Sequence, residues 1–200
     1  MTSQVKPSVR ETRRRETRER VFAAGFAEFR RAGMTGADVK AIAAAAGVAH
    51  GTLFFHFPSK EHLLVELVCR EEARLAAEFS SFLEEPHELN SSLTRLVAMV
   101  AGLEQRLGPV LFKELLASHF SPTRPVKDDW TDHPVIVLLV REIERARCDD
   151  AVHPEVDAFY GATFFLLGVY GVLTTTDDAA VRDDMLTKLV TTAVLGLGVR

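Results

Sequence analysis

Apolar residues recur every three or four positions along most of the chain, which is the period of an amphipathic α-helix. The alternation with period two that is typical of a half-buried strand is not sustained anywhere. The pattern therefore predicts an all-α protein of about nine helices. We expect these helices at about residues 9–32, 39–46, 50–57, 59–83, 89–107, 109–120, 134–147, 154–174 and 178–197.

The expected helix ends carry local stop and start signals. Gly33 can end the first helix in a left-handed conformation, and Asp38 can cap the second helix, which Gly47 then breaks. Pro58 and Ser59 open the fourth helix, with Ser59 as its cap. We therefore expect an N-terminal domain of residues 1–58 and a C-terminal helical domain of residues 59–200.

Charge is divided unevenly along the chain. The first 60 residues hold eleven of the 24 Lys and Arg residues but only five of the 28 Asp and Glu residues, in a chain of net charge −4. A basic segment on an acidic body indicates that only the N-terminal part approaches a polyanion such as DNA. The solvated face of an Arg/Glu-rich helix would give the same split.

Residues 39–57 have the pattern of a helix-turn-helix. Ile42 and Ala46 face inward from the first helix, and small alanines allow the second helix to approach closely. Gly47 provides the tight turn, and Leu53 fills the space between the two helices. This arrangement leaves the start of the second helix free to enter the major groove of DNA. The alternative is that both helices merely belong to the core.

Two runs within this region, IAAAAGV at 42–48 and GTLFFHFPSKEHLL at 51–64, resemble the signature of the TetR family of transcriptional regulators. The similarity covers about residues 10–65. It implies an N-terminal helix-turn-helix domain and a C-terminal domain for effector binding and dimerisation. By the same resemblance, we expect a homodimer that binds a palindromic operator in double-stranded DNA, acts as a repressor and is released by a small-molecule effector.

The resemblance also implies individual DNA contacts. These are expected at Thr35, Lys40, His50, Gly51, Thr52, Phe54, Phe55, His56 and Lys60. Phosphate contacts would come from Thr52, His56 and Lys60, and they position the protein without reading the sequence. Base edges would be read by His50, Gly51 and Phe55, with Thr52 beside them. Thr35 and Lys40 would hold the other side of the groove.

Three positions depart from the family pattern. Phe54 stands where tyrosine is usual and lacks a hydroxyl for a phosphate, and Ala49 stands where a Ser or Thr cap is common. Asp38 can cap its helix, but its charge opposes a nearby phosphate. These departures leave open a helical small-molecule-binding module with weakened or lost DNA recognition, and an activator would use the same fold.

The C-terminal half offers a candidate dimer face on its last two helices. Small and apolar residues recur there at helical spacing, so two helices from each subunit could form a four-helix bundle. The expected face consists of Gly161, Phe164, Gly168, Gly171, Leu186, Leu189 and Val190. Ordinary packing within one chain would produce the same pattern.

The middle helices supply residues for a ligand pocket. We expect Met99, Leu103, Phe112, Leu115, Leu116, His119, Phe120, Trp130, Phe159 and Thr163 to line it. The set is mostly apolar, which favours an aromatic or lipophilic effector. The same residue types also suit a dry core. Residues 121–133 form the one long irregular segment, and loops of that length are often functional.

Other functional classes lack their signatures. Cys69 and Cys148 are far apart and form no zinc or disulfide pattern, and no nucleotide-binding or hydrolase motif occurs, so we expect neither an enzyme nor a metal or cofactor. The first twenty residues are polar and Arg-rich, unlike a signal peptide. The longest apolar stretch, residues 158–173, is shorter than the ~20 residues of a spanning helix. We expect a cytoplasmic protein without membrane contact.

Overall fold

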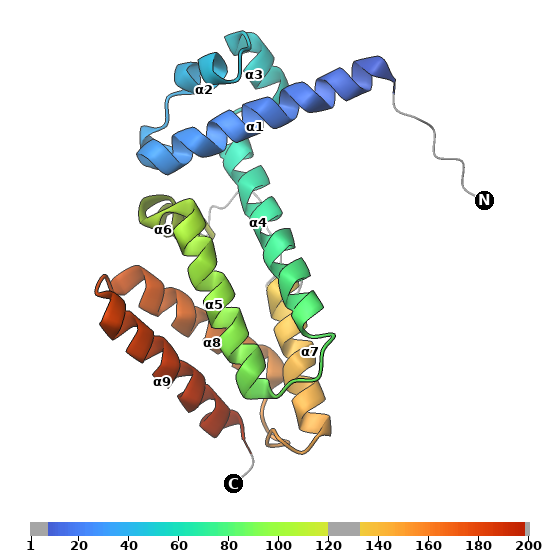
Figure 1. The fold of residues 1–200 in the computed structure, drawn as a ribbon, viewed down its shortest axis with the longest axis vertical. Coiled ribbons are helices and arrows are strands. Elements are labelled where there is room, and N and C mark those ends of the chain that lie inside the picture. The colour runs from blue at the N-terminus through green and yellow to red at the C-terminus, as the bar shows by residue number, and fades with distance from the viewer. Residues whose placement is uncertain (1–7, 120–132, 199–200) are drawn as a thin grey trace, which may run out of the picture. The chain divides into compact units, whose positions relative to one another are not determined.

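The computed structural model describes residues 8–119 and 133–198 (Figure 1). Within these ranges the chain forms nine α-helices and no strand, apart from one isolated bridge between Val152 and Gly198, so the predicted all-α fold is confirmed. The helices are α1 (Val9–Gly36), α2 (Val39–Ala45), α3 (His50–His56), α4 (Lys60–Phe82), α5 (Leu89–Leu107), α6 (Pro109–His119), α7 (Pro134–Cys148), α8 (Ala158–Thr175) and α9 (Ala179–Leu197).

The chain divides into two compact units, Met1–Leu67 and Val68–Arg200. The division falls inside α4, whereas the sequence analysis places the domain boundary before Ser59. The first turns of α4 group with the N-terminal helices because their apolar side chains are buried there. Leu63, for example, is 1% exposed and its methyl groups contact Gly25 of α1.

The first unit owes its helix ends to the signals in its sequence. Ser8 and Glu11 form a reciprocal capping box at the start of α1. Gly33 has φ 70°, where a glycine meets no Cβ penalty, and it interrupts the helix as expected; one further turn then reaches Gly36. Between α2 and α3, Gly47 takes φ 64° and makes the turn of the helix-turn-helix.

A small apolar core holds α1, α2, α3 and the start of α4 together. Its members are Val21, Phe29, Ile42, Leu53, Phe57, Leu63 and Leu67, each at most 2% exposed. Asp38 caps α2 by accepting a hydrogen bond of 2.8 Å from the backbone N–H of Lys40. Ala49 gives α3 no side-chain cap, so this seven-residue helix depends on packing for its stability.

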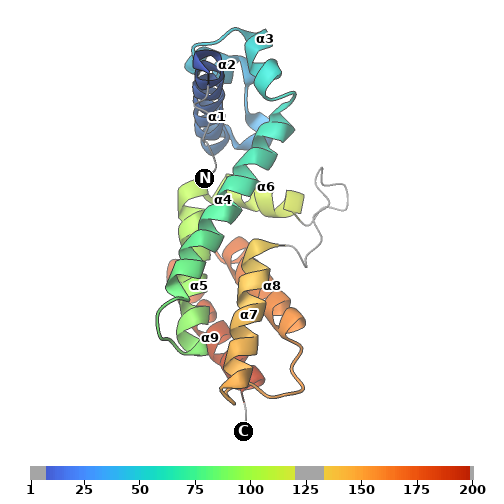
Figure 2. The same cartoon turned by 90° about the vertical axis from the view of Figure 1, so that its right-hand side faces the viewer.

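In the second unit, α5 packs against α6, α7, α8 and α9, while α7 pairs with α8 and α8 with α9 (Figures 1 and 2). α5 is therefore the central helix, and it buries one side from Leu89 to Leu107. Two carboxylates on these helices are buried as ion pairs. Glu104 of α5 accepts a hydrogen bond of 2.7 Å from Arg182 of α9. Glu142 of α7 accepts hydrogen bonds from a side chain of α5 and from its own helix.

The start of α8 differs from the expectation. The helix begins at Ala158 rather than at Pro154, with the Asp157 carboxylate capping its first turn. A long-range contact holds the preceding residues: the backbone N–H of His153 donates a hydrogen bond of 2.7 Å to the carbonyl of Leu197. Pro154 consequently lies in a turn.

α8 is also the one helix, among the described residues, that is long and apolar enough to cross a bilayer by length and composition. Core helices of soluble proteins pass the same test. Seven of its residues are buried within the chain, among them Phe165 and Leu166.

Candidate DNA-binding surface and effector pocket

The helix α3 divides into a buried and an exposed side. Leu53 and Phe57 are 2% and 1% exposed and fix the helix against the core of the first unit. His50 and Gly51 are exposed, and Phe55 is 66% exposed despite its large apolar ring. A helix with a firmly packed back and an open front is what base reading in a major groove requires.

The nine residues expected to contact DNA are all at least partly accessible. Thr35, Lys40, His50, Gly51 and Phe55 are exposed, and the remaining four are half-buried: Thr52, Phe54, His56 and Lys60. The ring of Phe54 meets that of His50 edge-on at 4.8 Å. Phe54 thus steadies another expected contact residue.

Lys60, an expected phosphate contact, also binds carbonyl groups inside the chain. Its Nζ donates to the carbonyl of Met34 at 2.9 Å and to that of Thr35 at 3.3 Å. Carbonyls near the end of a helix carry partial negative charge, so the ammonium ties the start of α4 to the end of α1. Sequence reasoning missed this role, because the two segments are 25 residues apart.

Two arginines of α1 that sequence reasoning left out lie against α3 and its C-terminal end. The guanidinium of Arg14 lies 5.1 Å from the ring centre of Phe55, and that of Arg18 lies 4.2 Å from the ring centre of Phe57. Arg18 also pairs with Glu66 at 3.0 Å. The helical spacing of these arginines with Val21 is the signal that could have revealed them.

These arginines affect the neighbouring histidine. Partial burial lowers the pKa of His56, and the positive charges of Arg14 and Arg18 lower it further. In the free protein His56 is therefore neutral at physiological pH, since its unperturbed value already lies near 6.5. It can donate one hydrogen bond to a phosphate without carrying a charge.

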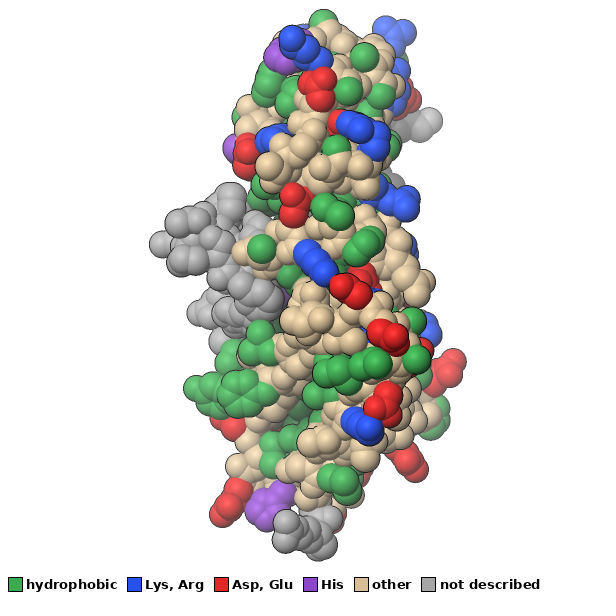
Figure 3. Space-filling view, turned by 90° about the vertical axis from the view of Figure 1, so that its left-hand side faces the viewer, with side chains coloured by type: hydrophobic (Ala, Val, Ile, Leu, Met, Phe, Trp, Pro, Cys, Tyr) green, Lys and Arg blue, Asp and Glu red, His purple; other side chains and the backbone are tan. Residues whose placement is uncertain are grey.

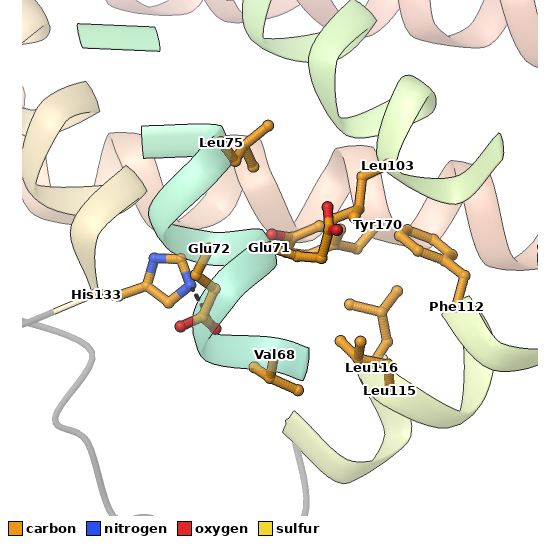
Figure 4. Close-up of a pocket in the computed structure, with 10 residues that line it drawn as sticks. All are labelled: Val68, Glu71, Glu72, Leu75, Leu103, Phe112, Leu115, Leu116, His133 and Tyr170. Carbon is orange, nitrogen blue, oxygen red and sulfur yellow. Dashed lines mark ion pairs between the residues drawn. The ribbon is translucent and has the colours of Figure 1, made fainter. Parts of the chain in front are cut away.

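A pocket lies within the second unit (Figure 4). It is lined by Val68, Glu71, Glu72, Leu75, Leu103, Phe112, Leu115, Leu116, His133 and Tyr170. Its hollow has a volume of about 450 Å³, including the solvent at its open side. The walls from α5 and α6 are apolar, and the polar groups come from α4, α8 and the residue just before α7.

The lining overlaps only in part with the expected pocket. Leu103, Phe112, Leu115 and Leu116 belong to both sets. Met99 is buried but does not line the pocket, and Phe159 and Thr163 do not line it either. The side chain of His119, together with Phe120, Trp130 and the irregular segment around Trp130, lies outside the described residues.

The polar groups of the pocket were missed. Glu72 lies 3.4 Å from His133, as the dashed line in Figure 4 marks, and Glu71 accepts 3.0 Å from Arg106. Burial, and then the charge of Glu72, raises the pKa of Tyr170, so its phenol stays neutral. The apolar pattern could not single out Glu71 and Glu72, because charged residues on a helix usually face water.

The expected dimer face is only partly open. Phe164 is 65% exposed and its ring stacks on that of Tyr160, with centres 5.9 Å apart. Gly171 has open space where a side chain would be. Figure 3 shows hydrophobic side chains among polar ones over the C-terminal unit, on the side that α9 occupies in Figure 1.

The other residues of that face pack within the chain. Leu186 and Val190 are each 6% exposed, and a Cβ at Gly168 would lie 2.9 Å from Leu189. Gly161 similarly faces Leu197. The large apolar residues that these two helices expose are Tyr160, Phe164, Leu167, Val181, Met185 and Leu195, of which only Phe164 belongs to the expected face.

A three-helix unit with an open recognition helix, followed by a helical unit with a pocket, is the architecture of a bacterial helix-turn-helix transcription regulator. Residues 21–67 match the family model described as "Bacterial regulatory proteins, tetR family". This match and the relatives below show that residues 21–67 are similar to the DNA-binding segment of the TetR family of transcriptional regulators.

Three similar proteins differ in their sequence identity to this chain and in how much of it they cover. The regulator UidR of Escherichia coli K12 is 26% identical over 165 residues, which are 82% of this chain and 83% of UidR. The repressor KstR of Mycobacterium tuberculosis is 43% identical, but over only 32% of this chain and 29% of KstR. The structure of Thermus thermophilus FadR with lauroyl-CoA superposes with a TM-score of 0.69 at 23% identity, covering 92% of this chain and 96% of FadR.

Proposed function

We propose that this protein is a cytoplasmic repressor that binds a palindromic operator as a homodimer and leaves it when a small, apolar or aromatic effector binds. The observation that carries the proposal is the open side of α3, where His50, Gly51 and Phe55 face solvent on a basic unit. Exposed aromatic and imidazole rings beside a glycine can approach base edges closely. KstR, named a repressor, is 43% identical over 63 residues of this chain.

Phosphate contacts would surround this reading face. Lys40 is exposed at the start of α2, and Thr52 lies on the same side of α3 as Phe55, one turn earlier. Neutral His56 adds one donor. Such contacts set the register of the protein on the duplex, while α3 selects the sequence.

A dimer would form through the exposed apolar side of α8. Tyr160, Phe164, Leu167 and Gly171 follow one another at intervals of four, three and four residues, which places them on one side of the helix. A second copy would cover the stacked rings, with Val181 and Met185 of α9 adding to the contact. The dimer would hold two recognition helices about one DNA turn apart, ~34 Å, and so match a palindrome.

The effector would enter the pocket of the second unit. The apolar walls of the pocket favour a lipophilic body, and Tyr170 and His133 can orient a polar group on it. That FadR is seen with lauroyl-CoA supports small-molecule control in this fold. The effector acts only through its different affinity for the DNA-bound and released states.

The first experiment is selection of binding sites from a random duplex library, followed by affinity measurements on the enriched sequence. Phe55→Ala and His50→Ala remove exposed side chains without disturbing the core. We expect each to weaken operator binding at least tenfold, the usual cost of losing a base contact. Arg141→Gln, an exposed charge change in the second unit, is the matched control and should bind normally.

Two other outcomes separate the alternatives. If the folded wild-type protein enriches no sequence and binds DNA no more tightly than His50→Ala does, the small-molecule-binding module is supported. Transcription in vitro that rises when the protein occupies its operator would identify an activator. Repression relieved by a pocket ligand is the result that we expect.

A further inference from the structure

The basic residues of α1 continue its buried stripe. Val21 and Gly25 face the core of the first unit, and stepping back from Val21 by three and then four residues leads to Arg18, Arg14 and Arg10. Residues at this spacing share one side of a helix. The side of α1 that is apolar against the core therefore becomes a row of arginines in its first turns.

The middle arginine of this row contacts the recognition helix. Its guanidinium lies 5.1 Å from the ring centre of Phe55, within the range of a cation–π interaction. Phe55 is 66% exposed, and its ring also meets that of His56 edge-on at 5.3 Å. Arg14 is thus a neighbour from another helix that limits where this exposed ring can point.

Arg14 and Arg18 differ in what neutralises them. Arg18 lies over Phe57 and donates 3.0 Å to Glu66, so its charge is paired within the unit. Among residues 8–119 and 133–198, no hydrogen bond or carboxylate partner is found for the guanidinium of Arg14 or Arg10.

We propose that Arg14 is a further DNA-contacting residue of this regulator, which positions Phe55 against the base edges and donates its free N–H groups to a backbone phosphate beside the recognition helix. The proposal rests on operator binding by α3. A guanidinium that stacks on a ring through its flat face keeps its in-plane N–H groups for other partners. Phosphate is the anion that these donors fit in paired fashion.

The two roles can be measured separately. Arg14→Gln removes both the charge and the cation–π contact, whereas Arg14→Lys keeps a charge but loses the planar fork. We expect Arg14→Gln to weaken operator binding by more than tenfold, because it loses one charge-assisted hydrogen bond, worth about tenfold, together with the positioning of Phe55. The slope of log affinity against log salt should become shallower by ~0.9, the value for one phosphate. Arg14→Lys should keep most of the slope.

The matched control is Arg15→Gln. Arg15 is the next residue on α1 and is exposed. Adjacent residues of a helix are about 100° apart, so the same loss of charge occurs on another side of α1. It should bind the operator with nearly the wild-type salt slope. Equal effects of Arg14→Gln and Arg15→Gln would overturn the proposal and leave only a general effect of net charge.

A double-mutant cycle tests the positioning role. If Arg14 orients Phe55, the losses from Arg14→Gln and Phe55→Ala should not multiply, and the double variant should bind about as weakly as Phe55→Ala alone apart from the phosphate loss. Fully multiplicative losses would refute positioning. Absence of any specific operator for the wild type would instead refute the proposed function, so the two failures are distinguishable.

Discussion

Among the residues that the structure describes, each unit exposes one phenylalanine, and the two are exposed to nearly the same degree. Phe55 of α3 is 66% exposed and Phe164 of α8 is 65% exposed. Phe55 lies beside the guanidinium of Arg14 and the imidazole of His56, whereas Phe164 stacks on Tyr160. Exposure alone therefore says little about a partner. The neighbours distinguish a polyanion, which needs donors around the ring, from a second protein surface, which needs more apolar area.

Each of the two units contains a buried glutamate that is paired with an arginine. Glu28 and Glu142 are both buried, and each accepts hydrogen bonds from an arginine three residues later, at 2.6 Å and 2.8 Å. In the first unit the additional donor is a backbone N–H, that of Asp38, at 3.1 Å. In the second unit Glu142 takes its additional donors from side chains outside α7. The bond from the backbone of Asp38 fixes the residue before α2 against α1. The bonds from Ser92 and His87 instead hold α7 against α5 and the segment before it.

The largest expected effect comes from Glu142→Ala. Glu142 accepts 2.7 Å from Ser92 and lies 3.0 Å from His87, so its removal leaves buried polar groups and Arg145 without their carboxylate. We expect the second unit to lose about 3–5 kcal/mol of unfolding free energy, the usual cost of breaking a buried pair on one side. Hydrogen exchange read by mass spectrometry should show the loss in α5 and α7.

Glu142→Gln serves as the control for this prediction. The amide oxygen can still accept from Ser92, so the variant should lie between Glu142→Ala and the wild type. Amides of α1 and α2 should keep their protection in both variants, because Glu28 holds that unit independently. Equal loss in both units would contradict this division of the two interiors.

The next effect concerns the exposed rings. Phe164→Asp places a charge on the apolar side of α8, and we expect the dimer dissociation constant to rise by about 100-fold, as for a central interface residue. Sedimentation over a range of concentrations measures it. Phe55→Asp should leave the dimer intact and abolish operator binding. A dimer unaffected by Phe164→Asp would refute the proposed interface.

The first unit was predictable because its signals are local. Asp38 caps α2, and Gly33 and Gly47 take positive φ, each for a reason that lies within a few residues of sequence. The exceptions are interactions between distant segments. Lys60 bonds to carbonyls 25 and 26 residues earlier, and Arg14 meets a ring on another helix.

For the second unit, the sequence predicts the positions of the helices well, but it predicts less well which of their residues are exposed. Periodicity shows that α8 and α9 are amphipathic, but whether an apolar side meets the same chain or another depends on tertiary packing. Leu186 and Val190 turned out to be buried within the chain, while Met185 is 41% exposed. Glu71 lines the pocket and pairs with Arg106, which lies 35 residues later in the chain.

A smaller effect tests a departure from the family pattern. Phe54 is half-buried and packs edge-on against His50, so Phe54→Tyr adds a hydroxyl with little change of shape. If that hydroxyl reaches a phosphate, we expect operator affinity to rise several-fold, since one hydrogen bond contributes about 0.5–1.5 kcal/mol. Titration by fluorescence anisotropy measures this. Unchanged affinity would show that position 54 serves only packing.

The last prediction concerns Glu28 at acid pH. Hydrogen bonds from Arg31 and from the backbone of Asp38 lower its pKa from 4.5 to about 2. Because the pKa is lower in the folded state, ionised Glu28 stabilises the unit above pH 4.5, and this contribution disappears as the pH falls through about 2. Glu28→Gln should therefore be less stable than the wild type at pH 5 to 7, with the gap closing toward pH 2. Urea unfolding at a series of pH values tests this, since the other titrating groups are common to both proteins. A gap that is independent of pH would mean that Glu28 acts through shape and not through its charge.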